Sequence, residues 1–298
     1  MNYSRQAVLS TTALIIVIGG LANAGGNTPR TANQIIEQIK SRAGKDWNAP
    51  TVDTVKAGDA GTPVTGIATT FAATYDVLER AAASGKNLII AHEPTFYNHL
   101  DSTTELQNDP VYRRKLEFIA SHHMVIFRFH DHWHEPQMTP DGILHGMVSA
   151  LGWQKFQQQN DPRRFVIPET TLSVLSEQLA STLKIRALRF VGDPAMNVTK
   201  VGLLPGAAGA ERQISLLERQ DIQVLIAGEA REWETVEYVR DAVSEHRPKA
   251  LILLGHVPSE EEGMRYCAEW LRTFITDIPI EFIPAREPFW TPNSTTRQ

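Results

Sequence analysis

The sequence predicts an α/β protein made of two related halves, each with a mixed or largely parallel sheet. Short apolar runs alternate along the chain with segments whose apolar residues recur at helical spacing, which is typical of α/β architecture. Several of the apolar runs also end in His or Glu. Because open α/β sheets bind ligands outside the carboxyl ends of their strands, we expect a metal site at those ends, between the halves.

The predicted elements begin with an amphipathic helix over 31–43, in which Ile35, Ile36 and Ile39 share one face. Other segments with helical spacing predict helices over 72–84, 109–122, 141–151, 170–183, 211–220, 230–245 and 259–275. Short apolar runs predict strands over 64–69, 87–91, 124–129, 188–192, 198–204, 222–227, 250–254 and 278–283. Strands and helices alternate through most of this order, as an α/β fold requires.

Two pairs of similar segments indicate that the halves are relatives. LIIAHE at 88–93 resembles VLIAGE at 224–229, and the runs at 125–130 and 251–256 both end in His. The expected divisions are a signal at 1–24, one half at 25–153, a connection at 154–169, the other half at 170–290 and a tail at 291–298. The Gln- and Pro-containing connection is expected to be a surface loop.

The composition excludes several classes of protein. The chain has 298 residues, of which 42% are hydrophobic and 21% charged, so it is not a disordered chain and can bury a substantial core. The formal net charge is −5 without a cluster of Lys and Arg, and we therefore expect no nucleic-acid partner. The single cysteine, Cys267, allows neither an intramolecular disulfide nor a Cys-rich zinc site.

The first 24 residues differ in kind from the rest. Arg5 precedes an apolar stretch over 7–22, which ends in the small-residue sequence Ala-Asn-Ala before two glycines. This order predicts a secretory signal over 1–24, with an uncleaved membrane anchor as the alternative. We expect a periplasmic or secreted protein without membrane contact after cleavage, because no other apolar run is long enough to span a bilayer.

Three segments supply possible metal ligands. His92 and Glu93 directly follow an apolar run, and the sequence His-Asp-His-Trp-His fills 130–134 after another. His256 ends a predicted strand, and Glu260 starts the following helix across a short loop. Imidazole and carboxylate are the donors that zinc, manganese, iron and nickel accept when thiolate is absent. We therefore expect these segments to meet around a metal.

Not every member of the segment at 130–134 can be a ligand. If the segment is extended, His130, His132 and His134 share one side and Asp131 lies opposite, whereas a turn after His130 would break this alternation. We expect Asp131 and His132 to orient ligand imidazoles through their second ring nitrogen.

Other polar groups have simpler interpretations. His122 and His123 close a predicted helix, where they suit the exposed carbonyl groups. Ser259 and Glu262 have the spacing of a capping box that opens a helix. The glycines at 206 and 209 follow a strand and either contact a phosphate group or form a plain turn.

These residues resemble the dinuclear-metal-centre family named for NGG-interacting factor three, whose members are also labelled homologues of GTP cyclohydrolase one type two. The resemblance runs from about Val55 to about Pro284. The motifs that carry it are HEP at 92–94, FHDHWH at 129–134, AGE at 227–229 and GHVPSE at 255–260. It implies two related α/β halves, two metal ions and usually a ring-shaped homohexamer.

The resemblance also implies a set of metal ligands, namely His92, Glu93, His130, His134, His256 and Glu260. Two of them depart from the family pattern, since Glu93 stands where the family has a second His and His134 where it has an Asp. An imidazole and a carboxylate have thus changed places, which leaves the number of donors unchanged. The export signal is a further departure, because the family is mostly intracellular.

Together these observations predict an exported hydrolase in which two divalent ions of Zn, Mn, Fe or Ni activate water toward an unidentified small molecule. Glu229 and Glu260 are the candidate catalytic carboxylates. Glu229 follows a predicted strand. We expect its carboxylate to transfer protons or to orient a ligand, and the alternative is that it only stabilises the positive end of a helix. The alternative function is a metal-binding oligomeric scaffold or carrier without turnover.

Overall fold

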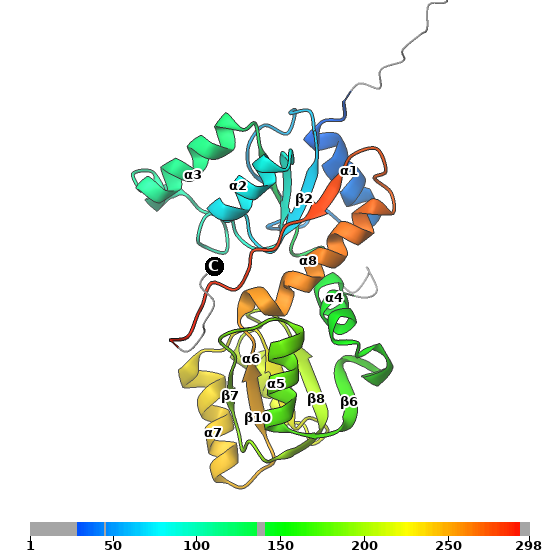
Figure 1. Cartoon of the computed structure of the whole chain (residues 1–298), viewed down its shortest axis with the longest axis vertical. Helices are drawn as coiled ribbons and strands as arrows, with labels where there is room; N and C mark the ends of the chain where they lie inside the picture. The colour runs from blue at the N-terminus through cyan, green and yellow to red at the C-terminus, as the bar shows by residue number, and fades with distance from the viewer. Residues whose placement is uncertain (1–28, 45, 136–140, 293–298) are drawn as a thin grey trace, which may run out of the picture.

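The computed structural model describes residues 29–44, 46–135 and 141–292, which form two α/β lobes stacked end to end (Figure 1). The predicted signal at 1–24 lies outside the described residues, and so does most of the predicted tail. Within the described ranges, no helix has both the length and the apolarity needed to cross a membrane.

The first lobe is built on a five-stranded sheet. Its strands are β1 (Val55–Ala57), β4 (Val125–Arg128), β3 (Leu88–Ala91), β2 (Ile67–Thr70) and β11 (Ile280–Phe282), named in spatial order. Strand β1 is antiparallel to β4, and the other neighbours are parallel. Helix α1 (Ala32–Ala43) packs on one face, and α2 (Tyr75–Ala83) and α3 (Pro110–Ser121) pack on the other. Strands β2, β3 and β4 are therefore buried along their whole length.

The second lobe repeats this plan on a six-stranded sheet. Its strands are β5 (Gln157–Gln158), β6 (Asp161–Thr171), β8 (Asn197–Leu204), β9 (Val224–Ala227), β10 (Ala250–Leu253) and β7 (Arg189–Val191), named in spatial order. The central strands β8, β9 and β10 are parallel. Helix α5 (Leu172–Thr182) packs on one face, and α6 (Ala210–Leu217) and α7 (Glu237–Ser244) pack on the other. A π-helical turn at Glu232–Val236 leads into α7.

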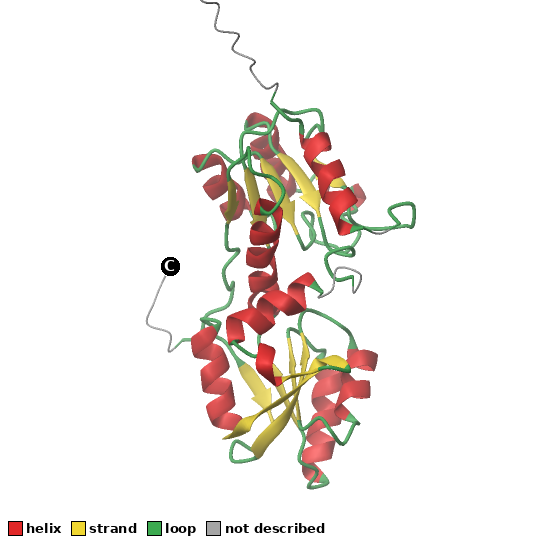
Figure 2. Ribbon diagram, turned by 90° about the vertical axis from the view of Figure 1, so that its right-hand side faces the viewer, coloured by secondary structure: helices red, strands yellow, loops and turns green. Residues whose placement is uncertain are grey.

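The two lobes exchange their last helices. Helix α4 (Gly142–Leu151) follows β4 of the first lobe, but its Leu144 and Met147 are buried in the core of the second lobe. Helix α8 (His256–Arg272) follows β10 of the second lobe, but its Met264 and Leu271 are buried in the core of the first. The two helices cross between the lobes, as Figure 2 shows. The repeated order of elements and this reciprocal exchange support the predicted relationship between the halves.

The structure places two segments differently from the predicted division of the chain. The expected surface connection at 154–169 contains most of β6, because Phe165 and Ile167 alternate inward and pack in the second core. Strand β11 falls within the predicted second half but pairs with β2 of the first sheet. The chain therefore crosses back to the first lobe after α8, and beyond β11 it returns to the second, where Glu287 accepts hydrogen bonds from the backbone N–H groups of Arg186 and Ala187.

Candidate metal centre

The predicted ligands of the first lobe lie at the carboxyl end of its sheet. His92 and Glu93 directly follow β3, and His130 lies two residues beyond the end of β4. The two strands are parallel, with Ala91 paired to Arg128 at their last residues. Their following side chains therefore emerge at the same edge.

A turn after His130 brings His134 to this edge as well. The backbone N–H of His134 donates to the carbonyl oxygen of His130 at 3.0 Å. The buried carboxylate of Asp53 accepts the backbone N–H groups of His130, Asp131 and His132 at 2.6, 3.0 and 2.9 Å. A carboxylate that accepts several backbone donors fixes a turn strongly, because each hydrogen bond is charge-assisted.

The two residues expected to orient ligands have different surroundings. Oδ1 of Asp131 lies 2.9 Å from Nδ1 of His130, where it orients that ring. His132 contacts Asp53 instead, with 2.7 Å between Nδ1 and Oδ2, and its ring stacks on Trp47 with 3.5 Å between the centroids. Because the turn replaces the extended alternation, His132 supports the turn and does not share a side with His130.

His256 and Glu260 both lie on α8, which begins at His256. The predicted capping box at Ser259 is wrong, because Ser259 lies inside the helix and donates its hydroxyl to the carbonyl oxygen of His256 at 2.7 Å. Residues at i and i+4 share one helix face, so both side chains point to the same place. The predicted turn at Gly206 packs directly on this face, since a Cβ there would overlap Oε1 of Glu260.

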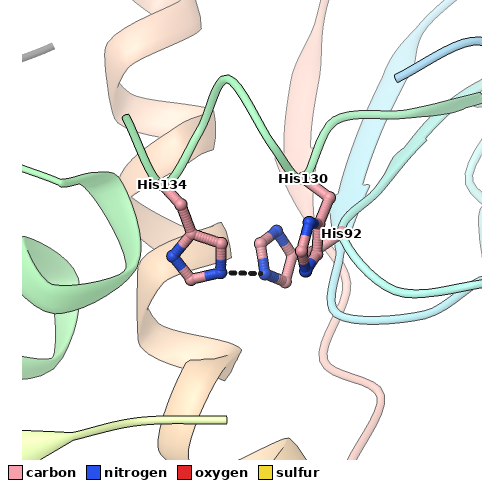
Figure 3. A group of neighbouring side chains, drawn as sticks. All are labelled: His92, His130 and His134. Atoms are coloured by element: carbon pink, nitrogen blue, oxygen red, sulfur yellow. Dashed lines mark hydrogen bonds between the residues drawn. The ribbon is translucent and has the colours of Figure 1, made fainter. Parts of the chain in front are cut away.

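The inward-facing atoms form two adjoining groups. In the first group, Nε2 of His92 lies 3.2 Å from Nε2 of His134 and 3.4 Å from Oε2 of Glu260. Figure 3 shows how the imidazoles of His92, His130 and His134 converge from the strand end and the turn. The ring centroids of His92 and His130 are 4.5 Å apart, so the second group begins beside the first.

The second group is centred on Glu93. Its Oε1 lies 3.5 Å from Nε2 of His130 and 3.3 Å from Nε2 of His256. Nε2 of His256 also lies 3.2 Å from Oε2 of Glu260, the same oxygen that faces His92. Glu260 therefore belongs to both groups, and the structure brings all six predicted ligand residues together.

Each of the four imidazoles keeps its other nitrogen against an oxygen. The Nδ1 contacts are His92 to the carbonyl oxygen of Phe129 at 3.2 Å, His130 to Asp131 at 2.9 Å, His134 to Asp141 at 3.4 Å and His256 to Glu229 at 2.9 Å. An oxygen on one ring nitrogen fixes the orientation of the imidazole and leaves the other nitrogen for a metal. Glu229 and Asp131 thus orient the imidazoles of His256 and His130 from outside the two groups.

Burial and neighbouring charges shift the pKa values of the groups in the site in different directions. Burial, with the two neighbouring imidazoles, holds the pKa of His92 well below its usual value. Burial disfavours the charged form of His256 too, but its contacts with three glutamates outweigh this and raise its pKa to about 12. Burial likewise opposes ionisation of Glu93, whose contacts with two imidazoles nevertheless keep its pKa well below the usual range.

The donor set fits a divalent cation. Glu260 is 2% exposed, and within the described residues its Oε2 has no hydrogen-bond partner. His92 and His134 face each other through Nε2 at 3.2 Å, and only one of the two nitrogens can donate a proton there. The ligand atoms of His92, His130 and His134 lie within 4.8 Å of one another, and so do those of His92, Glu93 and Glu260. A cation would satisfy these groups.

Sequence reasoning missed two residues that support the centre. Asp53 is 77 positions from His130 along the chain, and no motif links them. Asp141 is the N-cap of α4, accepts the N–H groups of Ile143 and Leu144, and turns its other oxygen to His134. Its place at the start of a predicted helix is the one signal that could have identified it.

Two similarly built lobes and a His/Glu cluster between strand ends of the first lobe and the start of α8 define a two-lobed α/β protein with a candidate metal centre. The chain belongs to the Duf34/NIF3 (NGG1p interacting factor 3) family, whose model matches residues 31–288. This match confirms the family that the motifs predicted.

The chain is also similar to individual proteins. A GTP cyclohydrolase 1 type 2 homolog from Clostridium acetobutylicum is 24% identical over 161 residues, which are 50% of this chain and 58% of that protein. The matched region thus spans little more than half of that relative. Staphylococcus aureus protein SA1388 has a TM-score of 0.68 at 16% identity and covers 89% of this chain and 100% of its own. A Bacillus cereus protein related to NIF3 has a TM-score of 0.69 at 15% identity, and it covers the same shares of the two chains. These structural similarities show the fold.

Proposed function

We propose that the protein is a metal-dependent hydrolase with a dinuclear divalent-metal centre. The observation that carries this proposal is the convergence of four imidazole Nε2 atoms and two carboxylates in two groups that share Glu260. Each imidazole is anchored at Nδ1, which is how proteins commonly hold imidazole for a metal.

The two groups supply separate ligand sets for two ions. The first set is His92, His134 and Glu260. The second set is Glu93, His130 and His256, together with the shared Glu260. A divalent cation supplies Lewis acidity, which lowers the pKa of water and polarises a carbonyl or phosphoryl group. The carboxylates of the chain would offset the charge of the ions, and the buried His92 and Glu260 would exclude bulk water from one side of the centre.

Glu229 is the residue best placed to move a proton. Its side chain is 56% exposed, and Oε1 lies 2.9 Å from Nδ1 of His256. Contact with His256 lowers the pKa of Glu229 despite partial burial, so the group is a carboxylate at neutral pH. It can therefore accept a proton from water at the rim of the centre while it orients His256.

Export and assembly complete the proposal. The sequence at 1–24 supports an exported protein, and the family resemblance supports a homohexamer. N-terminal sequencing of protein from each cell fraction tests the first, with a mature start at about Gly25 expected and an intact Met1 on membrane-bound protein contradicting it. Native mass spectrometry tests the second, and a monomer would contradict it.

Turnover by the purified chain is the test of the enzymatic proposal. Metal analysis should find about two divalent ions per chain, as expected from the two ligand sets. A panel of esters, amides and phosphate esters should then include a substrate whose hydrolysis stops on chelation and returns when the metal is restored. Tight metal binding by a stable oligomer without turnover across the panel would favour the carrier or scaffold instead.

A further inference from the structure

Arg128 lies buried directly behind the candidate metal centre, as the last residue of β4. Its side chain is fully buried. Nε donates to the carbonyl oxygen of His92 at 3.1 Å, and Nη1 donates to the carbonyl oxygen of His99 and, at 3.2 Å, to Oδ2 of Asp101. A guanidinium removed from water requires both hydrogen bonds and opposite charge nearby.

Four charged side chains balance one another at this position. Oδ2 of Asp101 contacts both Arg128 and Lys56, the latter at 3.6 Å, so this one carboxylate faces two cations. The second carboxylate is Glu93, whose Oε2 lies 3.6 Å from Nη2 of Arg128. Within the described residues Nη2 has no hydrogen-bond partner, which leaves Glu93 as the group that compensates it.

Glu93 therefore uses its two oxygens differently. Oε1 faces the Nε2 atoms of His130 and His256, at 3.5 and 3.3 Å, inside the centre. Oε2 faces the guanidinium of Arg128, outside it. Because the cation holds one oxygen, only the other is directed to the converging imidazoles.

We propose that Arg128 is a positioning residue that holds Glu93 as a one-oxygen ligand and thereby sets the metal preference of the centre. The inference rests on the proposed metal site. A carboxylate bound through one oxygen occupies one coordination position, and one bound through both occupies two. Restricting Glu93 to Oε1 favours ions that accept low coordination numbers, such as Zn²⁺, over those that prefer six oxygen-rich positions, such as Mn²⁺.

The test compares Arg128→Met in two backgrounds. In the wild-type background, loss of the guanidinium frees Oε2, and the preference for Zn²⁺ over Mn²⁺ should fall by about tenfold, which is within the range by which loss of an outer contact changes the affinity for a metal. Visible absorption of the Co²⁺-loaded protein should weaken, since absorption intensity falls as coordination number rises. In the Glu93→Gln background the amide offers a single oxygen, so Arg128→Met should alter the preference by less than about threefold.

Lys56→Met is the matched control. It removes a cation from the same Asp101 carboxylate without touching Glu93, so the Zn²⁺ to Mn²⁺ preference should stay as in the wild type. Equal shifts from Arg128→Met in both backgrounds, or the same shift from Lys56→Met, would overturn the proposal. If Arg128→Met does not fold, Arg128→Lys replaces it, because a single ammonium cannot reproduce the fork of contacts. Unaltered preference and Co²⁺ absorption in Arg128→Lys would refute the role.

Failure of the proposed function has a different signature. A wild-type chain that binds neither Zn²⁺ nor Co²⁺ would remove the metal centre itself and the inference with it. If the wild-type chain binds both metals and the variants keep the wild-type metal preference, only the proposed role of Arg128 is refuted.

Discussion

A Cβ on Gly146 of α4 would lie 2.5 Å from Cα of Gly263 on α8, so these two helices cross backbone to backbone. In both helices the crossing lies close in sequence to residues at or beside the candidate centre. Helix α4 begins after Asp141, which contacts His134, and α8 begins at His256. The glycine contact thus sets the separation of α4, which follows Asp141, from α8, which carries His256 and Glu260.

Gly146→Ala should therefore destabilise the protein and loosen the centre. The added methyl group has to push the helices apart, and overpacking of this kind costs about 1–3 kcal/mol. Thermal unfolding of the metal-free chain and metal affinity measure the two effects. Ser149→Ala, at an exposed position of the same helix, is the control and should change neither. Wild-type stability in Gly146→Ala would mean that the crossing adapts easily.

His256→Ala should lose at least one equivalent of metal while the fold persists. The residue begins α8 and contacts Glu93 and Glu260, but the strand before it packs without it. Metal content after dialysis and circular dichroism report the two properties. His123→Ala, at the exposed end of a helix, should retain the full content. Full metal content in His256→Ala would contradict the assignment of this ligand.

Metal uptake should release protons, and affinity should rise with pH. In the metal-free chain the pKa of His256 is raised to about 12, so at neutral pH its imidazole carries a proton that a metal must displace. Each displaced proton makes the affinity rise about tenfold per pH unit below that pKa. The sign for folding is opposite, because the stabilising contacts of protonated His256 are complete below its unfolded pKa and are lost as pH rises through about 12. Calorimetric titration in buffers of different ionisation enthalpy counts the protons; none released would contradict the assigned charge state.

Asp53→Asn should weaken the turn that holds His130 and His134 in place. The carboxylate accepts three backbone N–H groups and contacts Nδ1 of His132, whereas an amide has a single acceptor oxygen. We expect a loss of about 1–3 kcal/mol in unfolding free energy and a fall of about tenfold or more in metal affinity. The exposed Asp59, which caps a tight turn, provides the control variant Asp59→Asn. Equal effects at both positions would show that Asp53 has no special relation to the centre.

The elements were predictable because their signal is local. Every predicted helix and strand overlaps an observed one, since apolar spacing over a few residues determines both. Strand β6 was missed because Pro162 and Pro168 obscure the inward alternation of Phe165 and Ile167. The place of β11 in the first sheet could not be predicted, because pairing with β2 depends on contacts across more than two hundred residues.

The candidate ligand residues were predictable where they directly follow an apolar run in the sequence, as His92 and His130 do. Two of the surrounding groups, Asp53 and Asp141, were not predicted, because they reach the centre through the folded turn and not through any spacing in the sequence. Arg128 carried a signal that was overlooked, since a charged residue inside the apolar run at 125–129 has to be buried and paired. The assignment of the ligands to metal stays a prediction.

Glu93 and His134, the two positions at which the sequence resemblance implies a departure from the family pattern, give the sharpest test of that assignment. Glu93→His alone removes the counter-charge of the buried Arg128, and His134→Asp alone adds an anion beside Asp141 and Glu260. Each single reversion should therefore destabilise the metal-free chain and shift metal preference more than it abolishes binding. The double reversion restores both the donor set that the resemblance implies and the net charge. The two positions are coupled, because His134 lies near Glu260 and Glu93 shares the contact with His256 that Glu260 also makes. The double variant should therefore still bind two ions, and its loss of affinity and stability should be smaller than the sum of the losses in the two single variants. Metal content, affinity and thermal unfolding of the four proteins complete the cycle. Strict additivity without metal loss would place both residues outside the coordination of the metal.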